Sequence, residues 1–269
     1  MIIHNSQFII EFIPYFHIST FAHFYKMPIT FAHPAAILPL AFIKRKWWSY
    51  TGLIIGSVIP DFEGFMRLGG QKVYSHTWEG MFWFDLPLGL FVAFLFHYVV
   101  RDAAIDNMPG PLYRRFVFFR ELNWNLYALR NFLKLVISML IGITTHLLWD
   151  RVTHTDSYGY VQKVGIVLPP DENIELRQTL QYVSSIVGML IMGWWIWSLP
   201  KSDTARTTRL WWPYWPVIAV SGFLFYLVVQ EHLPGHVDDL INSVIAGSLI
   251  GWVLMSVLFR LVNAKIKSE

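Results

Sequence analysis

The sequence predicts an all-α, polytopic membrane protein built as a bundle of transmembrane helices. Of its 269 residues, 55% are hydrophobic and only 14% are charged, whereas a soluble domain carries roughly a quarter charged residues. The mean hydropathy is +0.43. Several runs of about 20 residues hold almost no charge, and an α-helix of that length spans the hydrocarbon core of a bilayer.

Two short apolar segments precede the full spans, at residues 29–43 and 47–60, with the basic triplet 44–46 between them. At about 13–15 residues each they barely cross the bilayer, so a tight pair of short membrane helices is expected. About five full spans follow, and they are expected at residues 81–100, 131–149, 182–199, 210–229 and 240–259.

We expect a single transmembrane domain over residues 27–269, since no internal repeat or low-complexity tract divides it. Residues 1–26 lack the basic leading region and the small-residue cleavage site of a secretory signal. Met27 could be the true start, which would make residues 1–26 an N-terminal extension, and the sequence leaves this open. Gly247 and Gly251 indicate close helix packing, either within the chain or between two copies.

The distribution of Lys and Arg predicts the orientation of the chain in the membrane. With a cytoplasmic C-terminus, fifteen of the 21 basic residues fall on the inner side and five on the outer side. The outer segments are rich in Asp and Glu, and an electronegative face of that kind suits a cation. We therefore expect a multi-pass protein of the cell membrane whose functional site lies on the outer side.

A row of ionisable residues closes the fourth segment. In GITTHLLWDRVTH, residues 142–154, the side chains of His146, Asp150 and His154 recur every fourth residue and share one side of a helix. Ionisable residues inside a membrane are costly and mark functional sites. A simpler alternative is a hydrogen bond between His146 and Asp150 within the helix.

Three more such residues, His33, Asp61 and His76, are expected at the same membrane level, because they lie at outer helix ends or in an outer loop. Imidazole and carboxylate groups suit Zn²⁺, Mn²⁺ or Fe²⁺, and the chain has no cysteine for thiolate ligation. Zinc, as one or two ions, is the first expectation. Each histidine alone could instead be a hydrogen-bonded interfacial residue. Asp85, near the start of its span, is expected to support a metal-bound histidine.

Four blocks of the chain resemble a bacterial integral membrane family catalogued as domain-of-unknown-function family 4184. They are MPITFAHPAAILPL, GSVIPDFEGF, YSHTWEGMFWFDLPLG and GITTHLLWDRVTH, and they cover about residues 27 to 155. The family has no established biochemical activity. The resemblance implies a location in the bacterial inner membrane and leaves the function open.

The order of histidines and aspartates is also similar, more distantly, to the ligand order of bacterial zinc-dependent phospholipases C and of membrane-bound predicted metal-dependent hydrolases. This resemblance implies that the catalytic carboxylates are Asp61 and Asp150. It implies these metal ligands: His33, Asp61, His76, His146, Asp150 and His154. The phospholipases also use an N-terminal amino group and a downstream His/Glu pair. Neither can be placed here, so one or two ions are expected instead of three.

The sequence thus predicts a metal-dependent hydrolase that cleaves an ester or phosphoester of a lipid or lipid-linked substrate with a metal-bound hydroxide. Membrane lipids are the expected partners, and no basic stripe indicates nucleic acid. The alternative is a non-enzymatic membrane protein, either a metal or proton transporter or an envelope scaffold. A transporter would place ionisable residues near mid-span, whereas here they gather at one end.

Overall fold

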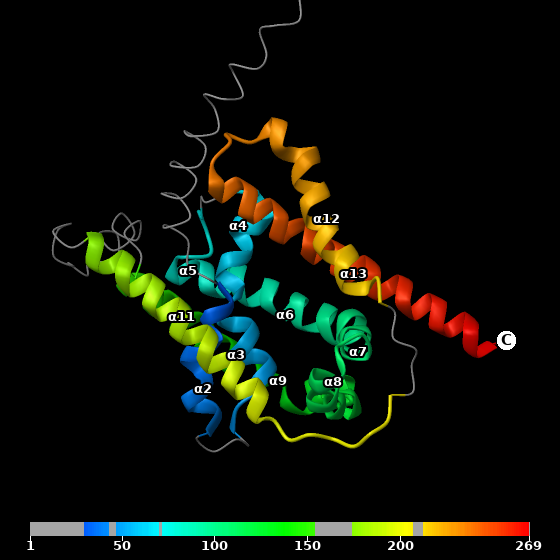
Figure 1. Ribbon diagram of the computed structural model, residues 1–269. Helices are drawn as coiled ribbons and strands as arrows, with labels where there is room; N and C mark the ends of the chain where they lie inside the picture. Colours follow the sequence, from blue (N-terminus) through cyan, green and yellow to red (C-terminus); the bar gives the residue numbers. More distant parts are fainter. Residues whose placement is uncertain (1–29, 43–46, 70–71, 154–173, 207–211, 269) are drawn as a thin grey trace, which may run out of the picture.

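Five long apolar helices dominate the computed structural model, which describes residues 30–42, 47–69, 72–153, 174–206 and 212–268 (Figure 1). Within these ranges it contains helices and turns but no strand. The helices long and apolar enough to cross a membrane are Trp78–Asp106, Trp124–Thr153, Thr179–Ser198, Tyr214–His232 and Asp238–Lys265. The predicted all-α class and the five predicted spans are therefore confirmed.

Each of the two N-terminal apolar segments also contains a short helix. The first follows a 3₁₀ turn, η1 (Thr30–Ala32), and is α2 (Pro34–Phe42); the second is α3 (Tyr50–Gly56), and the two are in contact. The basic triplet expected between them lies outside the described residues. After α3 come the 3₁₀ turn η3 (Ile59–Asp61), where Pro60 lies within the turn, and α4 (Phe62–Arg67).

The first full span is one helix with two π-helical segments. In chain order it consists of α5 (Trp78–Gly80), the π segment η4 (Met81–Asp85), α6 (Leu86–Leu95), the π segment η5 (Phe96–Val100) and α7 (Arg101–Asp106). π-helical turns are rare and often occur at functional sites. The first of these segments ends at Asp85, which is fully buried.

The connection between the first two full spans, residues 107–123, is largely helical. The segment follows α7 and folds into α8 (Gly110–Phe116) and the 3₁₀ turn η6 (Val117–Glu121), before α9 (Trp124–Thr153) begins. Polar groups of the segment and of α7 bond to one another: Arg120 lies 2.7 Å from Asp106, and Arg101 donates to the Leu122 carbonyl. Charged residues that are paired in this way can be held against the bundle instead of extending into solvent.

The C-terminal part contains α11 (Ile174–Ser198), α12 (Tyr214–Val229), the 3₁₀ turn η7 (Gln230–His232) and α13 (Val237–Ser268). Helices α12 and α13 form a closely packed pair (Figure 1). A methyl group on Gly251 would lie 1.9 Å from the Ser221 hydroxyl, and one on Gly247 would lie 2.4 Å from the Phe225 side chain. The Gly247–Gly251 motif thus serves packing within the chain.

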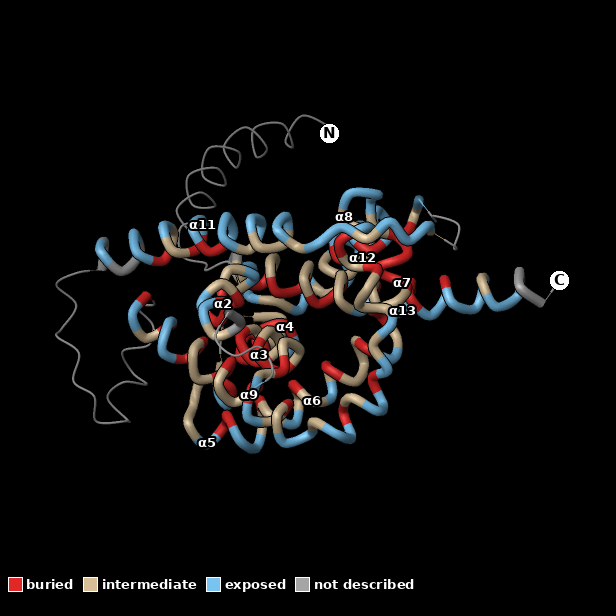
Figure 2. The backbone as a smooth tube through the Cα atoms, turned by 90° about the horizontal axis from the view of Figure 1, so that it is seen from below, coloured by how far each residue is buried: buried red, intermediate tan, exposed pale blue. Residues whose placement is uncertain are grey.

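Helices α3 and α9 meet backbone to backbone, in the region where Figure 2 shows buried residues gathering. A methyl group on Gly56 would lie 2.2 Å from the Met139 carbonyl oxygen, and one on Gly142 would lie 2.5 Å from the Leu53 carbonyl oxygen. Small residues permit this close approach. In a membrane the hydrophobic effect does not drive helices together, so close van der Waals packing stabilises their contact instead. The contact places the chain that follows α3 beside the C-terminal part of α9.

We expect Gly142→Ala to destabilise the protein by about 1–3 kcal/mol, because the added methyl group overpacks the α3–α9 contact. Thermal unfolding of the detergent-solubilised protein measures the change. The matched control is Gly193→Ala on α11, where an added methyl group would meet nothing within 4 Å. Equal unfolding temperatures for the two variants would show that the helices are not in backbone contact.

Candidate metal centre

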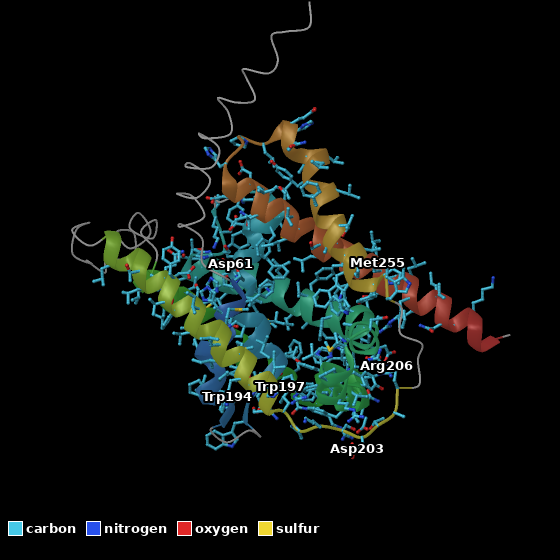
Figure 3. All side chains as sticks on the ribbon, in the orientation of Figure 1. Asp61, Trp194, Trp197, Asp203, Arg206 and Met255 are labelled. Atoms are coloured by element: carbon cyan, nitrogen blue, oxygen red, sulfur yellow. The ribbon has the colours of Figure 1, made fainter. Side chains whose placement is uncertain are left out.

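Five of the six predicted ligands lie together beyond the end of α3 and beside the last two turns of α9: His33, Asp61, His76, His146 and Asp150. Figure 3 labels Asp61 in the interior of the bundle, where its side chain is buried. The sixth predicted ligand, His154, lies outside the described residues.

Four of these residues form a compact group that could hold a metal ion. One ligand atom from each of Asp61, His76, His146 and Asp150 lies within 4.8 Å of the other three. Asp61 ends η3, His76 lies in the loop before α5, and the other two occupy successive turns of α9. Three of the four residues are buried and His76 is partly exposed. This is the convergence that the sequence predicted.

The hydrogen bonds of His146 fix which of its ring nitrogens faces the group. Its Nδ1 lies 2.8 Å from the Ser57 carbonyl oxygen, and since a carbonyl oxygen only accepts, Nδ1 carries the proton and donates. In the neutral ring Nε2 then presents a lone pair, 3.2 Å from Asp150 and 3.6 Å from Asp61. This buried Nε2 has no hydrogen-bond partner among the described residues. An Nε2 that faces two carboxylates is stabilised when it carries a proton or when its lone pair binds a cation, so the position suits either a proton or a metal ion.

His76 presents the same atom to the group. Its Nε2 lies 3.1 Å from both Asp150 Oδ2 and the Lys72 ammonium, and its Nδ1 lies 2.9 Å from the Ser75 hydroxyl. Burial and the neighbouring Lys72 charge lower the pKa of His76 to about 4. The imidazole is therefore neutral at physiological pH, which is the form that binds a metal.

His33 stands at the edge of the group. Its ring stacks on that of His146 with 4.0 Å between centroids, and its Nε2 lies 3.6 Å from Asp150 Oδ1. It therefore contacts a member of the group without belonging to the set whose ligand atoms all converge. That His33 itself binds metal stays a prediction.

Lys72 is a member of the site that sequence analysis missed. Its ammonium donates to Asp61 Oδ1, so a positive charge lies beside a buried carboxylate. Burial alone would raise the pKa of Asp61, but the ammonium holds it well below its usual range. The available signal was a lysine four residues before His76 on a predicted outer side that is mostly acidic.

Glu63 organises the loop that carries Lys72 and His76. Its buried carboxylate accepts hydrogen bonds from the backbone N–H groups of Val73, Tyr74 and Ser75 at 2.8–3.0 Å. Arg67 donates to the same carboxylate at 2.7 Å. Burial opposes ionisation, but these donors lower the pKa of Glu63 to about 2. With its oxygens already bonded, Glu63 is a support for the site and not a ligand.

Asp85 was expected to support a metal-bound histidine, and this expectation is wrong. The side chain is fully buried, and neither carboxylate oxygen has a hydrogen-bond partner among the described residues. It lies within electrostatic range of His146 without a bond to it. The π segment η4, whose last residue is Asp85, turns the side chain into the bundle without delivering it to an imidazole.

A family model described as a domain of unknown function, DUF4184, matches residues 27–262. No curated protein and no solved structure matches the sequence. The comparisons therefore assign a family but no activity, and the function has to be argued from the geometry.

We expect Glu63→Gln to lower metal affinity by about 10–100-fold, the usual effect of losing a residue that orients a ligand. The amide cannot accept all the hydrogen bonds that the carboxylate accepts, so the loop no longer holds His76 in place. The free energy of unfolding should fall by about 1–3 kcal/mol. Zinc titration by calorimetry and thermal unfolding measure the two effects.

The matched control for this substitution is Glu79→Gln, at an exposed position in the same part of the chain. It should leave both quantities unchanged. If the two variants bind zinc equally well, the carboxylate of Glu63 has no part in positioning the loop.

Proposed function

The chain belongs to the family described as domain of unknown function DUF4184, and we propose that it is a metal-dependent hydrolase of membrane lipids or lipid-linked molecules. The proposed reaction is cleavage of an ester or phosphoester bond. The observation that carries the proposal is the group of four converging ligand atoms from Asp61, His76, His146 and Asp150, set in a membrane helix bundle.

The donor set supports zinc as the ion. Two imidazoles and two carboxylates, with no thiolate, are ligands of the kind found in hydrolytic zinc sites, although Mn²⁺ and Fe²⁺ accept the same donors. A bound ion would supply a Lewis acid and a water acidic enough to attack at neutral pH. One or two ions are compatible with a group that contains two carboxylates.

The residues of the chain supply the remaining requirements for hydrolysis. Asp61 and Asp150 belong to the group, so a carboxylate oxygen of either that does not hold the ion is placed to take the proton of an attacking water. The Ser57 carbonyl fixes the orientation of the His146 ring, and the ring of His33 covers one face of the His146 ring by stacking on it. The ammonium of Lys72 is a cation within the group and would stabilise negative charge that develops on a phosphoryl or acyl oxygen.

The position of the group supports a membrane substrate. Asp150 lies in the last turn of the span Trp124–Thr153, so the group is within about 5–10 Å of the end of that helix. Lipid headgroups and the adjoining ester bonds occupy this depth. We further propose, from the distribution of basic residues, that this end faces outwards.

Purified wild-type protein should contain a stoichiometric transition metal, measured by plasma mass spectrometry. His146→Ala and Asp150→Asn should lower metal affinity by at least about 100-fold, because each removes a ligand. Release of nitrophenol from p-nitrophenyl butyrate or bis(p-nitrophenyl) phosphate should depend on the same residues. Wild-type protein without metal would refute the proposal.

Lys72→Gln is the matched control for the ligand substitutions. It also changes a buried contact of Asp61 but removes a competing cation, so metal binding should persist or become tighter. A loss of metal in Lys72→Gln equal to that in Asp150→Asn would mean that disruption of the fold, and not loss of a ligand, explains both.

Reporter fusions test the orientation. A periplasmic reporter should be active after Gly159 and a cytoplasmic reporter after Thr204, because these residues lie in consecutive connections on opposite sides of the predicted topology. The opposite pattern would place the metal group on the cytoplasmic side.

A further inference from the structure

An elongated cavity of about 160 Å³ lies beside the metal group, between η1 and α2, the end of α9 and one face of α11. On α11 the lining residues include Gln181, Ser184, Gly188 and Ile191, whose spacing of three, four and three residues keeps them on one side of the helix. From Gln181 to Ile191 the cavity follows the helix axis for about 15 Å.

The cavity results from small side chains and not from a wide separation of the helices. A methyl group on Gly188 would lie 2.9 Å from the Ala32 side chain, so α11 and η1 are almost in backbone contact there. Next to this contact the facing positions are Ala35 on α2 and Ser184 on α11, which leave space unfilled. The close approach limits the width of the cavity and suits an unbranched chain.

The lining changes in character along α11. Gln181 and Ser185 are polar and buried near the beginning of the span, whereas Val187 and Ile191 are apolar and further along it. Since Thr179–Ser198 is long enough to cross a membrane, Ile191 lies about 18 Å into the span, at hydrocarbon depth. The cavity therefore has a polar part near one membrane face and an apolar part within the bilayer.

The cavity adjoins both the metal group and the surface that lipids cover. His33 lines the cavity, and the same ring stacks on His146, so one imidazole ring separates the two spaces. At the margin Trp149 and Ile191 are 41% and 38% exposed, and both belong to membrane spans. A molecule in the bilayer can thus reach the cavity from the side.

From this arrangement we propose that the cavity binds the proximal part of an unbranched acyl chain of a phospholipid, whose ester or phosphoester group then lies at His33 and the metal group. The inference rests on the proposed function and names its substrate class. An engineered apolar cavity of about 150 Å³ stays dry and binds benzene, so this one holds on the order of six carbons. The rest of the chain leaves past Trp149 and Ile191 into the bilayer.

Photolabelling tests the proposal without requiring turnover. The full chain is placed in nanodiscs of diphytanoyl phosphatidylcholine, whose branched chains should not compete, doped with a phosphatidic acid that carries a diazirine near the carboxyl end of one unbranched acyl chain. After irradiation, mass spectrometry should find the label concentrated on the cavity residues Ala36, Trp149 and Val187. An excess of unlabelled phosphatidic acid should reduce this labelling, whereas farnesyl phosphate, which is branched, should not.

Two substitutions that fill the cavity provide the contrast. Ser184→Trp from α11 and Ala35→Phe from α2 should each lower labelling of the cavity by about tenfold, a loss equivalent to about 1.4 kcal/mol of binding. The matched control is Ile186→Trp, on the same helix but 59% exposed and outside the cavity. In this variant the cavity residues should be photolabelled as strongly as in the wild type.

The outcomes separate this inference from the proposed function. Label spread over all lipid-facing positions, or equal labelling in the filled and control variants, overturns the acyl-chain site even if the protein contains metal and hydrolyses esters. Cavity labelling that persists after chelation with EDTA supports the site independently of catalysis. Displacement by farnesyl phosphate as effective as that by phosphatidic acid overturns the preference for an unbranched chain.

Discussion

The glycine contact between α3 and α9 is the constraint on which the rest of the site depends. In a bilayer, burial of apolar side chains gives helices little reason to associate, because lipid tails are equally apolar. Close van der Waals packing takes over that role, and Gly52, Gly56 and Gly142 allow it by bringing backbones together. The two helices run in the same direction, because Gly52 lies beside Leu135 and the later residue Ser57 lies beside His146. Ser57 and Asp61, which follow α3, therefore meet the part of α9 that carries His146 and Asp150.

Once these groups are gathered, electrostatics decides what the site can hold. Two buried carboxylates close to each other are costly unless a cation accompanies them. In the structure the ammonium of Lys72 partly fills this role at Asp61, while the Nε2 of His146 still faces carboxylate oxygens with no hydrogen bond. A divalent ion bound here would accept the lone pair of that nitrogen and oxygens of both carboxylates together. These described residues could therefore hold a metal ion.

The sequence was sufficient to predict the spans and the convergence of the site but not its supports. Long apolar runs are dictated by bilayer thickness, and alternation of helix direction alone brings the ends that carry Asp61, His76 and Asp150 to one level. The roles of Lys72 and Glu63 depend on a loop whose path is set by three backbone hydrogen bonds to a single carboxylate, and no local pattern encodes that path. The helical segment at residues 110–121 likewise depends on contacts formed in the tertiary structure, among them the ion pair of Arg120 with Asp106.

The position of His33 links the chemistry of the metal group to the recognition of a membrane substrate. Pro34 follows it and begins α2, so the imidazole projects from the start of the helix and not from its side. One face of the ring lies against His146, and the residue also lines the cavity between α2 and α11. A substrate chain in that cavity would contact the His33 ring, which lies beside Asp150. The same ring would limit how closely the headgroup approaches the metal group. Binding of the apolar part of a lipid and placement of its scissile bond would then be coupled through one side chain. Such coupling lets binding energy from a part of the substrate that does not react be used to position the part that does.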